Sequence, residues 1–193
     1  MILSAMNLYI PCFARHCIVD NLQGAGQGFT GKLAIDWRPF ALGPNSKLPL
    51  LVYRHAVPAD PAAIERIFTA NRWPAAWRDQ VHPFHHFHSD AHEVLGVASG
   101  SAKVRFGGPA GQLLDVSAGD VVVVPAGVGH CNEAKTADLL IVGAYPDNTE
   151  RRDLRRGKPA EHDEVVRNIA AVKLPPADPV SGADGPLSRL WGA

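Results

Sequence analysis

Five of the nine histidines of this 193-residue chain lie within eleven residues, 82–92. Successive side chains of a β-strand point to opposite faces, so His86 and His88 point the same way and His85 points the other way. Imidazole is the most common metal ligand among side chains. Two imidazoles on one face therefore form half of a metal site.

A carboxylate follows this histidine run directly. Residues 89–92 suit a hairpin turn, which would return Glu93 and the apolar run Val94–Ala98 to the neighbourhood of the histidines. A histidine-rich turn can also be a solvated loop, and a lone histidine on an apolar face is more often a hydrogen-bonded core residue. Two imidazoles on one face with a carboxylate beside them are a mixed nitrogen and oxygen set, which favours binding of a first-row transition metal.

The composition limits the partners and the compartment. Nineteen basic and nineteen acidic residues leave no net charge, so we expect neither nucleic acid nor an anionic membrane surface as a partner. No stretch approaches the roughly 18 apolar residues of a membrane-spanning helix. Three cysteines are too few for a disulfide framework, which indicates a reducing compartment. We therefore expect a soluble, cytoplasmic protein.

The sequence predicts an all-β fold. Sixteen prolines and eighteen glycines indicate many turns, and short runs rich in valine and leucine lie between them. The four valines 121–124 are typical of a strand buried on both faces. Other strands are expected at residues 48–53, as an edge strand, and at residues 102–106, 113–116 and 137–145.

Two helices flank these strands. Asp60 and Pro61 are typical of a helix start, with an apolar stripe of Ala63, Ile64, Ile67 and Phe68, an end at Asn71 and Pro74, and Trp73 and Trp77 packed beneath. The second helix is expected at residues 160–172, with Val165, Val166, Ile169 and Val172 on one face. We expect an irregular tail after it, whose apolar residues Leu187, Leu190 and Trp191 dock on the body or on a neighbouring subunit.

Four regions follow from this pattern. Residues 1–31 are an atypical, flexible N-terminal extension, and residues 32–74 are a strand and a helix that pack on a barrel. Residues 75–146 form the barrel, and residues 147–193 form a helix and a docked tail. The glycine-rich stretch 24–33 lacks the Ser or Thr and the following helix of a phosphate-binding loop, so no nucleotide cofactor is expected.

Two motifs resemble those of the cupin superfamily. The first is matched by His86, His88, Glu93 and Gly100, and the second by Gly119, Pro125, Gly127 and His130. The chain departs from the usual pattern at Gln80, where cupins have Gly, and at Ala134, where they have Asn, while Asn132 stands two positions early. Residues 36–191 resemble the YjlB-like cupin group more closely, through Tyr53-Arg54, Trp77-Arg78, residues 92–96, residues 143–146 and residues 184–187.

This resemblance implies a single cupin double-stranded β-helix, a jelly-roll barrel, with a short helix before it and a helix and irregular tail after it. It also implies that one divalent transition metal, Fe, Mn, Ni or Zn, binds inside the barrel. The implied metal ligands are His86, His88, Glu93 and His130. The reading from the residues agrees, because three imidazoles and a carboxylate leave open positions on such a metal.

The remaining candidates rank below these four. His82 has the parity of His86, but Pro83 interrupts the strand, and His85 and His92 are expected at the surface or as supporting groups. Cys131 is expected to be a small buried thiol rather than a ligand. Arg105 and Tyr53 could line the barrel and orient a substrate, or could equally be exposed.

Two functions remain open at this point. The first is a metal-dependent enzyme that acts on a small organic molecule, with isomerase, dioxygenase and decarboxylase chemistry all represented among cupins. The alternative is a non-catalytic small-molecule or metal-binding module such as a sensor, although no DNA-binding helix-turn-helix accompanies it. A storage cupin fits less well because all four ligand positions are filled. A homodimer is expected, as for other small cupins.

Overall fold

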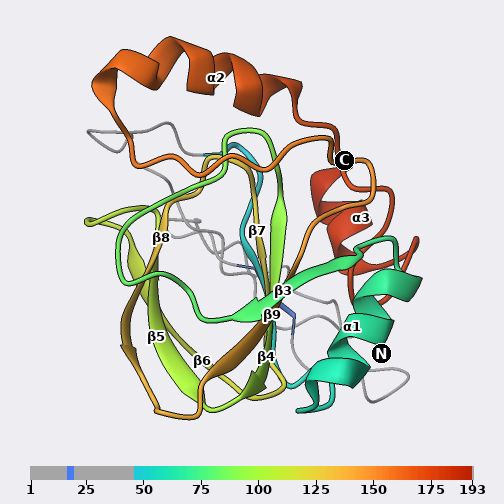
Figure 1. Ribbon diagram of the computed structural model, residues 1–193. Helices are drawn as coiled ribbons and strands as arrows, with labels where there is room; N and C mark the ends of the chain where they lie inside the picture. The colour runs from blue at the N-terminus through green and yellow to red at the C-terminus, as the bar shows by residue number, and fades with distance from the viewer. Residues whose placement is uncertain (1–16, 20–45, 193) are drawn as a thin grey trace, which may run out of the picture.

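The computed structural model describes residues 17–19 and 46–192, in which two sheets face each other (Figure 1). The strands are β1 (Cys17–Val19), β2 (Leu51–Tyr53), β3 (Ala75–Asp79), β4 (Glu93–Ser99), β5 (Ser101–Phe106), β6 (Gln112–Ser117), β7 (Val121–Val124), β8 (His130–Lys135) and β9 (Leu140–Ala144). The helices are α1 (Pro61–Ala70), the 3-10 helix η1 (Pro159–Glu161), α2 (His162–Ala171) and α3 (Pro186–Trp191). The all-β jelly-roll architecture expected from the sequence is confirmed.

The two sheets differ in size. The larger has the order β1-β2-β7-β4-β9-β3 and the smaller the order β6-β5-β8, and all pairings are antiparallel except β1 with β2. The prediction of an edge strand at residues 48–53 is wrong, because β1 pairs with β2 on its outer side. Strands β3 and β8 have no counterpart among the predicted strands, since neither carries the apolar run that marked the others.

The larger sheet separates two apolar clusters. Val122 and Val124 of β7 lie in the inner cluster between the sheets, and Val121 and Val123 lie in the outer cluster beneath the helices. The predicted strand buried on both faces is therefore confirmed. The inner cluster also holds Leu95, Val97, Val104, Phe106 and Ile141, and the outer cluster holds Ile64, Phe68, Trp73, Leu187 and Trp191.

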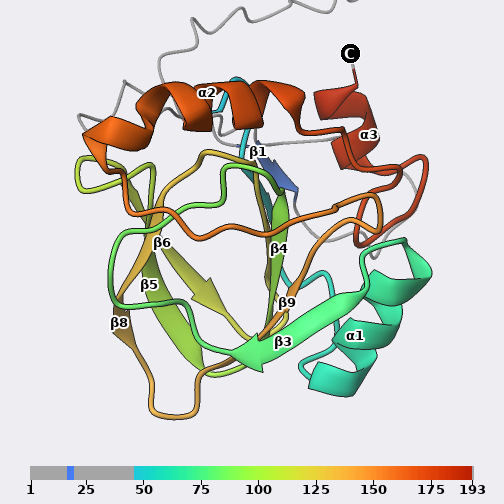
Figure 2. The same cartoon turned by 45° about the horizontal axis from the view of Figure 1, so that its top comes forward.

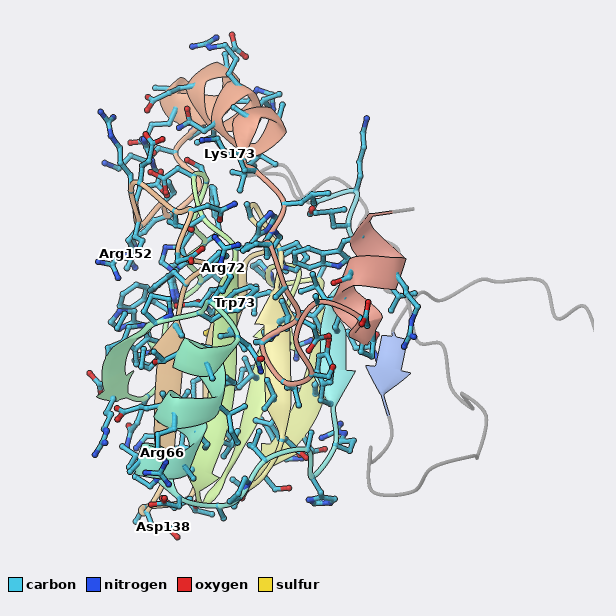
Figure 3. The ribbon with its side chains drawn as sticks, turned by 90° about the vertical axis from the view of Figure 1, so that its right-hand side faces the viewer. Arg66, Arg72, Trp73, Asp138, Arg152 and Lys173 are labelled. Carbon is cyan, nitrogen blue, oxygen red and sulfur yellow. The ribbon has the colours of Figure 1, made fainter. Side chains whose placement is uncertain are left out.

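Helix α1 packs on the outer face of the larger sheet, as Figures 1 and 3 show. It begins as predicted, since the Asp60 side chain accepts a hydrogen bond from the backbone N–H of Ala63, which would otherwise have no intrahelical partner. Trp73 lies beneath it as expected, fully buried. Trp77 does not, because it belongs to β3 and packs against the inner cluster.

Strands β3 and β9 fit closely at Trp77 and Gly143. Gly143 lies opposite Trp77 across the β3–β9 pair, and a Cβ on Gly143 would lie 1.9 Å from Trp77 Cε2. A glycine at this position lets the indole lie flat against the strand. The ring consequently forms part of the wall at the end of the barrel.

The C-terminal part covers the barrel. Helix α2 runs across one end of it, while α3 lies on the outer face near α1 (Figures 1 and 2). Of the four residues predicted to face the body from α2, Val165 is buried, but Val166 is 41 % exposed. The predicted irregular tail contains helix α3, and its residues Leu187 and Trp191 pack on the outer cluster of the same chain.

Apart from β1, the predicted extension 1–31 and its glycine-rich stretch 24–33 lie outside the described residues. Within residues 17–19 and 46–192, no helix combines the length and apolarity needed to cross a membrane.

We expect Gly143→Ala to lower the free energy of unfolding by about 1–3 kcal/mol, because the added methyl group overlaps the Trp77 ring. The same substitution in a Trp77→Ala background should cost much less, since the space is then free. Urea denaturation of the four proteins measures this. Equal losses in both backgrounds would contradict the packing described here.

Candidate metal centre

The histidine run enters the barrel as a loop rather than as a strand. His86 exchanges backbone hydrogen bonds with His130 at the start of β8, at 3.2 and 2.8 Å, and Phe87 pairs in the same way with Arg155. The predicted hairpin with β4 is wrong. Both edges of β4 are already occupied by β7 and β9, so the loop pairs with β8 of the other sheet.

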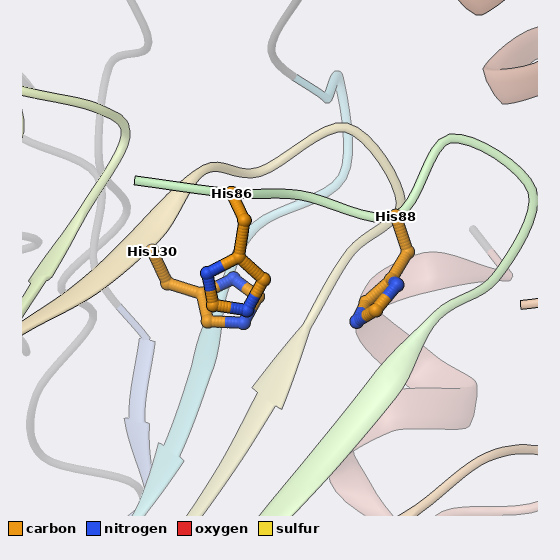
Figure 4. Close-up of side chains that lie close together, drawn as sticks. All are labelled: His86, His88 and His130. Carbon is orange, nitrogen blue, oxygen red and sulfur yellow. The ribbon is translucent and has the colours of Figure 1, made fainter. Parts of the chain in front are cut away.

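Three histidines from this loop and from β8 meet at one end of the barrel (Figure 4). The imidazole nitrogens of His86, His88 and His130 that could bind a metal all lie within 4.8 Å of one another. His86 and His130 are buried, and the His88 side chain is 10 % exposed. The structure therefore contains a buried three-histidine cluster that could bind a metal.

Each of these rings is oriented by a backbone carbonyl. The Nδ1 atoms lie 3.0 Å from the Phe84 oxygen for His86 and 3.2 Å from the Val128 oxygen for His130, and His88 Nδ1 contacts the Asp153 oxygen. A carbonyl can only accept, so each Nδ1 carries a proton, and Nε2 is the atom that each ring offers to a metal.

Glu93 opens β4 beside the cluster. Its Oε2 atom lies 3.4 Å from His88 Nε2 and 3.3 Å from His130 Nε2. Its Oε1 atom accepts a hydrogen bond of 2.6 Å from the Tyr145 hydroxyl. The residue is only 2 % exposed, and within the described chain Oε2 is buried without a hydrogen-bond partner.

The charges in the cluster are strongly coupled. Burial alone would raise the pKa of Glu93, but the adjacent His88 and His130 hold it well below its usual range. Burial likewise opposes protonation of His88, yet Glu93 raises its pKa to about 9. Burial lowers the pKa of His86 to about 3, which keeps this imidazole neutral. Glu93 thus stabilises positive charge next to it, whether that charge is a proton or a metal cation.

A cavity of about 230 Å³ opens onto the three histidines. The apolar part of its wall comes from Trp77, Val81, Leu95, Tyr145 and Leu154, and the polar part from Asp79, Gln80 and His82. Trp77 Nε1 donates to the Tyr145 hydroxyl at 3.3 Å. Burial and the neighbouring Glu93 raise the pKa of Tyr145, so its hydroxyl stays protonated and continues to donate to Glu93.

Comparisons with known proteins show the family of this chain. A family model described as Cupin matches residues 83–164. The uncharacterized protein YjlB of Bacillus subtilis is 41 % identical over 143 residues, which are 74 % of this chain and 86 % of YjlB. This chain belongs to the cupin superfamily. The resemblance drawn from the two motifs is confirmed.

Solved structures similar to this cupin include a DUF861-family protein of Thermotoga maritima and the 11S globulin procruciferin of Brassica napus. The first has a TM-score of 0.29 and 19 % identity, covering 40 % of this chain and 83 % of its own. The second has a TM-score of 0.37 and 17 % identity, covering 72 % of this chain and 35 % of its own. Similarities this low carry no further argument.

The remaining histidines of residues 82–92 lie outside the cluster. His85 is half-buried, and His82 lines the cavity, stacked on Phe84 with ring centres 4.8 Å apart. His92 is not at the surface: it is 2 % exposed, its Nδ1 accepts from the Ala126 N–H, and its ring packs on Trp191. Burial lowers the pKa of His92 to about 4, so it is a neutral core residue.

Three further candidates do not line the cavity. Tyr53 is buried in the outer cluster, where its hydroxyl donates to Asp178 at 2.6 Å. Arg105 pairs with Glu133 on the surface of the smaller sheet. Cys131 is a buried free thiol, as predicted.

Sequence reasoning assigned no role to Tyr145 or to residues 153–155. The alternation of β9, in which Ile141 and Gly143 face inward, could have indicated that Tyr145 does too. No pattern in the sequence indicated a role for Asp153. Its carboxylate accepts from the Ser89 N–H at 2.6 Å and from the Ser89 hydroxyl at 2.5 Å, which fixes the loop next to His88.

We expect Asp153→Ala to lower the free energy of unfolding by about 1–3 kcal/mol, because the fully buried Ser89 would lose the acceptor of its N–H. Asp163→Ala is the matched control, since that side chain is 88 % exposed and should change stability by less than about 0.5 kcal/mol. Chemical denaturation measures both. Equal effects of the two substitutions would argue against the role given to Asp153.

Proposed function

We propose that this cupin binds one divalent transition metal through His86, His88, His130 and Glu93, and that it acts with this metal on a small organic molecule. The observation that carries the proposal is Glu93 Oε2, which is buried without a hydrogen-bond donor and lies next to the Nε2 atoms of two histidines. A buried carboxylate oxygen is costly unless a cation compensates it. A metal between these atoms supplies that compensation.

The donor set suits Fe, Mn, Ni or Zn. Three neutral imidazoles and one carboxylate leave open coordination positions on each of these metals. When bound, such a metal supplies Lewis acidity, or redox chemistry if it is iron or manganese, as in isomerase or dioxygenase reactions.

The chain itself supplies orientation and exclusion of water. Tyr145 keeps its proton and holds Glu93 through Oε1, which leaves Oε2 directed at the histidines. Trp77 and Leu95 provide an apolar wall beside the ligands. His82 lines the same cavity, and its imidazole can donate a proton to a bound molecule or accept one from it. Such a group favours an enzyme over a binding module.

An enzyme should take up oxygen or convert a substrate, and this activity should be lost when the proposed metal ligands are substituted. A non-catalytic module should show no such activity. The homodimer and the cytoplasmic location stay predictions.

We expect near-stoichiometric metal in the protein purified without an affinity metal column, and its loss in His86→Ala/His130→Ala, because two of the ligands are then absent. His162→Ala is the control, since that ring is 60 % exposed and is not part of the cluster. Elemental analysis gives the content of each. Metal retained at full stoichiometry in the double variant would refute the site, as would its absence from the parent after reconstitution.

We expect Tyr145→Phe to weaken metal binding by about 10–100-fold, because Glu93 loses the hydrogen bond that orients it. Tyr53→Phe also removes a hydroxyl from a buried tyrosine, but on the outer face, so it should leave metal affinity unchanged. Competition with a chelator measures the two affinities. If Tyr145→Phe binds the metal as tightly as Tyr53→Phe, the Tyr145 hydroxyl does not orient Glu93 for metal binding.

A further inference from the structure

Residues 151–156, called here the rim segment, contribute Leu154 to the wall of the cavity. Asp153 and Arg155 point toward the histidine loop and α2: they bond to each other, and Arg155 also pairs with Glu164 of α2 at 2.5 Å. Leu154 points the other way and lines the cavity. Arg152 and Arg156, which flank Leu154 at intervals of two residues, lie on its side of the segment.

Both arginines stack on aromatic rings at the edge of the cavity. The Arg152 guanidinium lies 5.0 Å from the centre of the Tyr145 ring, which lines the cavity. The Arg156 guanidinium lies 4.2 Å from the centre of the Phe84 ring, which stacks on His82 of the cavity wall. Two positive charges are therefore held beside the entrance to the candidate metal centre.

These two charges lack an acidic counterpart. Within the described part of the chain, no carboxylate lies within 4.0 Å of Arg152 or Arg156, whereas Arg78, Arg105 and Arg155 all have one. Stacking on a ring uses the face of a guanidinium and leaves its N–H edge free to donate. Both side chains are exposed, so these donors can reach a molecule from solution.

The rest of the cavity limits what that molecule can be. Asp79, at the end of β3, adds an acidic residue to the cavity wall, so an anionic group is favoured near the two arginines and disfavoured near Asp79. Trp77, Val81 and Leu95 offer apolar surface for a carbon skeleton. The volume of about 230 Å³ lies below the roughly 300–1,000 Å³ typical of sites for drug-sized ligands, so the molecule is small.

We propose that the cavity takes a small organic carboxylate, bound through its anionic group by Arg152 and Arg156 and through its carbon skeleton by the apolar wall. The planar fork of a guanidinium matches the two oxygens of a carboxylate. Inorganic phosphate would satisfy the arginines but would leave the apolar wall without a partner. This inference rests on the proposed function only in placing the reactive part of the substrate at the metal.

The test compares carboxylates with uncharged analogues of similar shape and with an anion that has no carbon skeleton. Isothermal titration calorimetry of the purified protein, with its metal content determined, would use the short dicarboxylates malonate, succinate and glutarate, their uncharged diamides, and inorganic phosphate. Arg152→Gln/Arg156→Gln removes the proposed anion site. Arg66→Gln/Arg189→Gln is the matched control, because it removes the same charge from exposed arginines outside the cavity, and Arg66 lies well away from Arg152 (Figure 3).

We expect at least one dicarboxylate to bind at millimolar concentrations or below, and its diamide and phosphate to bind at least about tenfold more weakly. Arg152→Gln/Arg156→Gln should weaken binding of the dicarboxylate by about tenfold or more at unchanged metal content, and the control by less than about twofold. No binding of any dicarboxylate, a diamide or phosphate that binds as tightly, or equal binding by the parent and Arg152→Gln/Arg156→Gln overturns the proposal.

The two proposals fail separately. Binding that survives in Arg152→Gln/Arg156→Gln but depends on the metal overturns the arginine site and leaves the metal centre in place. Binding that depends on the arginines in a protein without metal supports the carboxylate site, while the proposed metal function fails.

Discussion

The carboxylate of Glu93, buried at the end of a mostly apolar barrel, is the constraint on which the rest of the site depends. A charge in such a place is tolerated only if other groups compensate it. The groups around it come from the loop before β4, from β8 and from the end of β9: His88 and His130 lie beside Oε2, and the Tyr145 hydroxyl donates to Oε1. The buried charge is therefore tolerated only when β9 pairs with β4 and the loop lies beside β8.

The C-terminal part helps to build the three-histidine cluster. The loop that carries His86 and His88 belongs to neither sheet. It is anchored by isolated backbone pairs to His130 and Arg155, and by backbone hydrogen bonds that the carbonyls of His82 and His88 accept from the N–H groups of Asn132 and Gly127. Asp153 completes this anchoring, because its carbonyl accepts from His88 and its side chain holds Ser89. The next residue, Leu154, lines the cavity, so one stretch of chain both positions His88 and contributes to the cavity wall.

Strand parity predicted much of this arrangement. The spacing of His86 and His88 indicated that both point the same way, and the structure brings them together with His130. The position of Glu93 beside them was also anticipated, although the hairpin expected to bring it there does not exist. Pairing partners are decided by which sheet edges remain free, and this depends on the whole set of strands. The sequence did not indicate β3, β8 or the inward position of Trp77 either, because these strands lack an apolar run of their own.

What the sequence by itself determined is local. The cap of α1 at Asp60, the alternation of the four valines of β7 and the parity of the histidines all follow from backbone geometry within a few residues. The tertiary structure alone decided which distant residues complete the site. Tyr145 reaches Glu93 across 52 residues and Asp153 reaches His88 across 65. Arg152 and Arg156 meet the rings of Tyr145 and Phe84 only because of the course of the rim segment. Such contacts depend on the closure of the barrel and on where the chain runs after its last strand, and neither is encoded in the spacing of neighbouring residues.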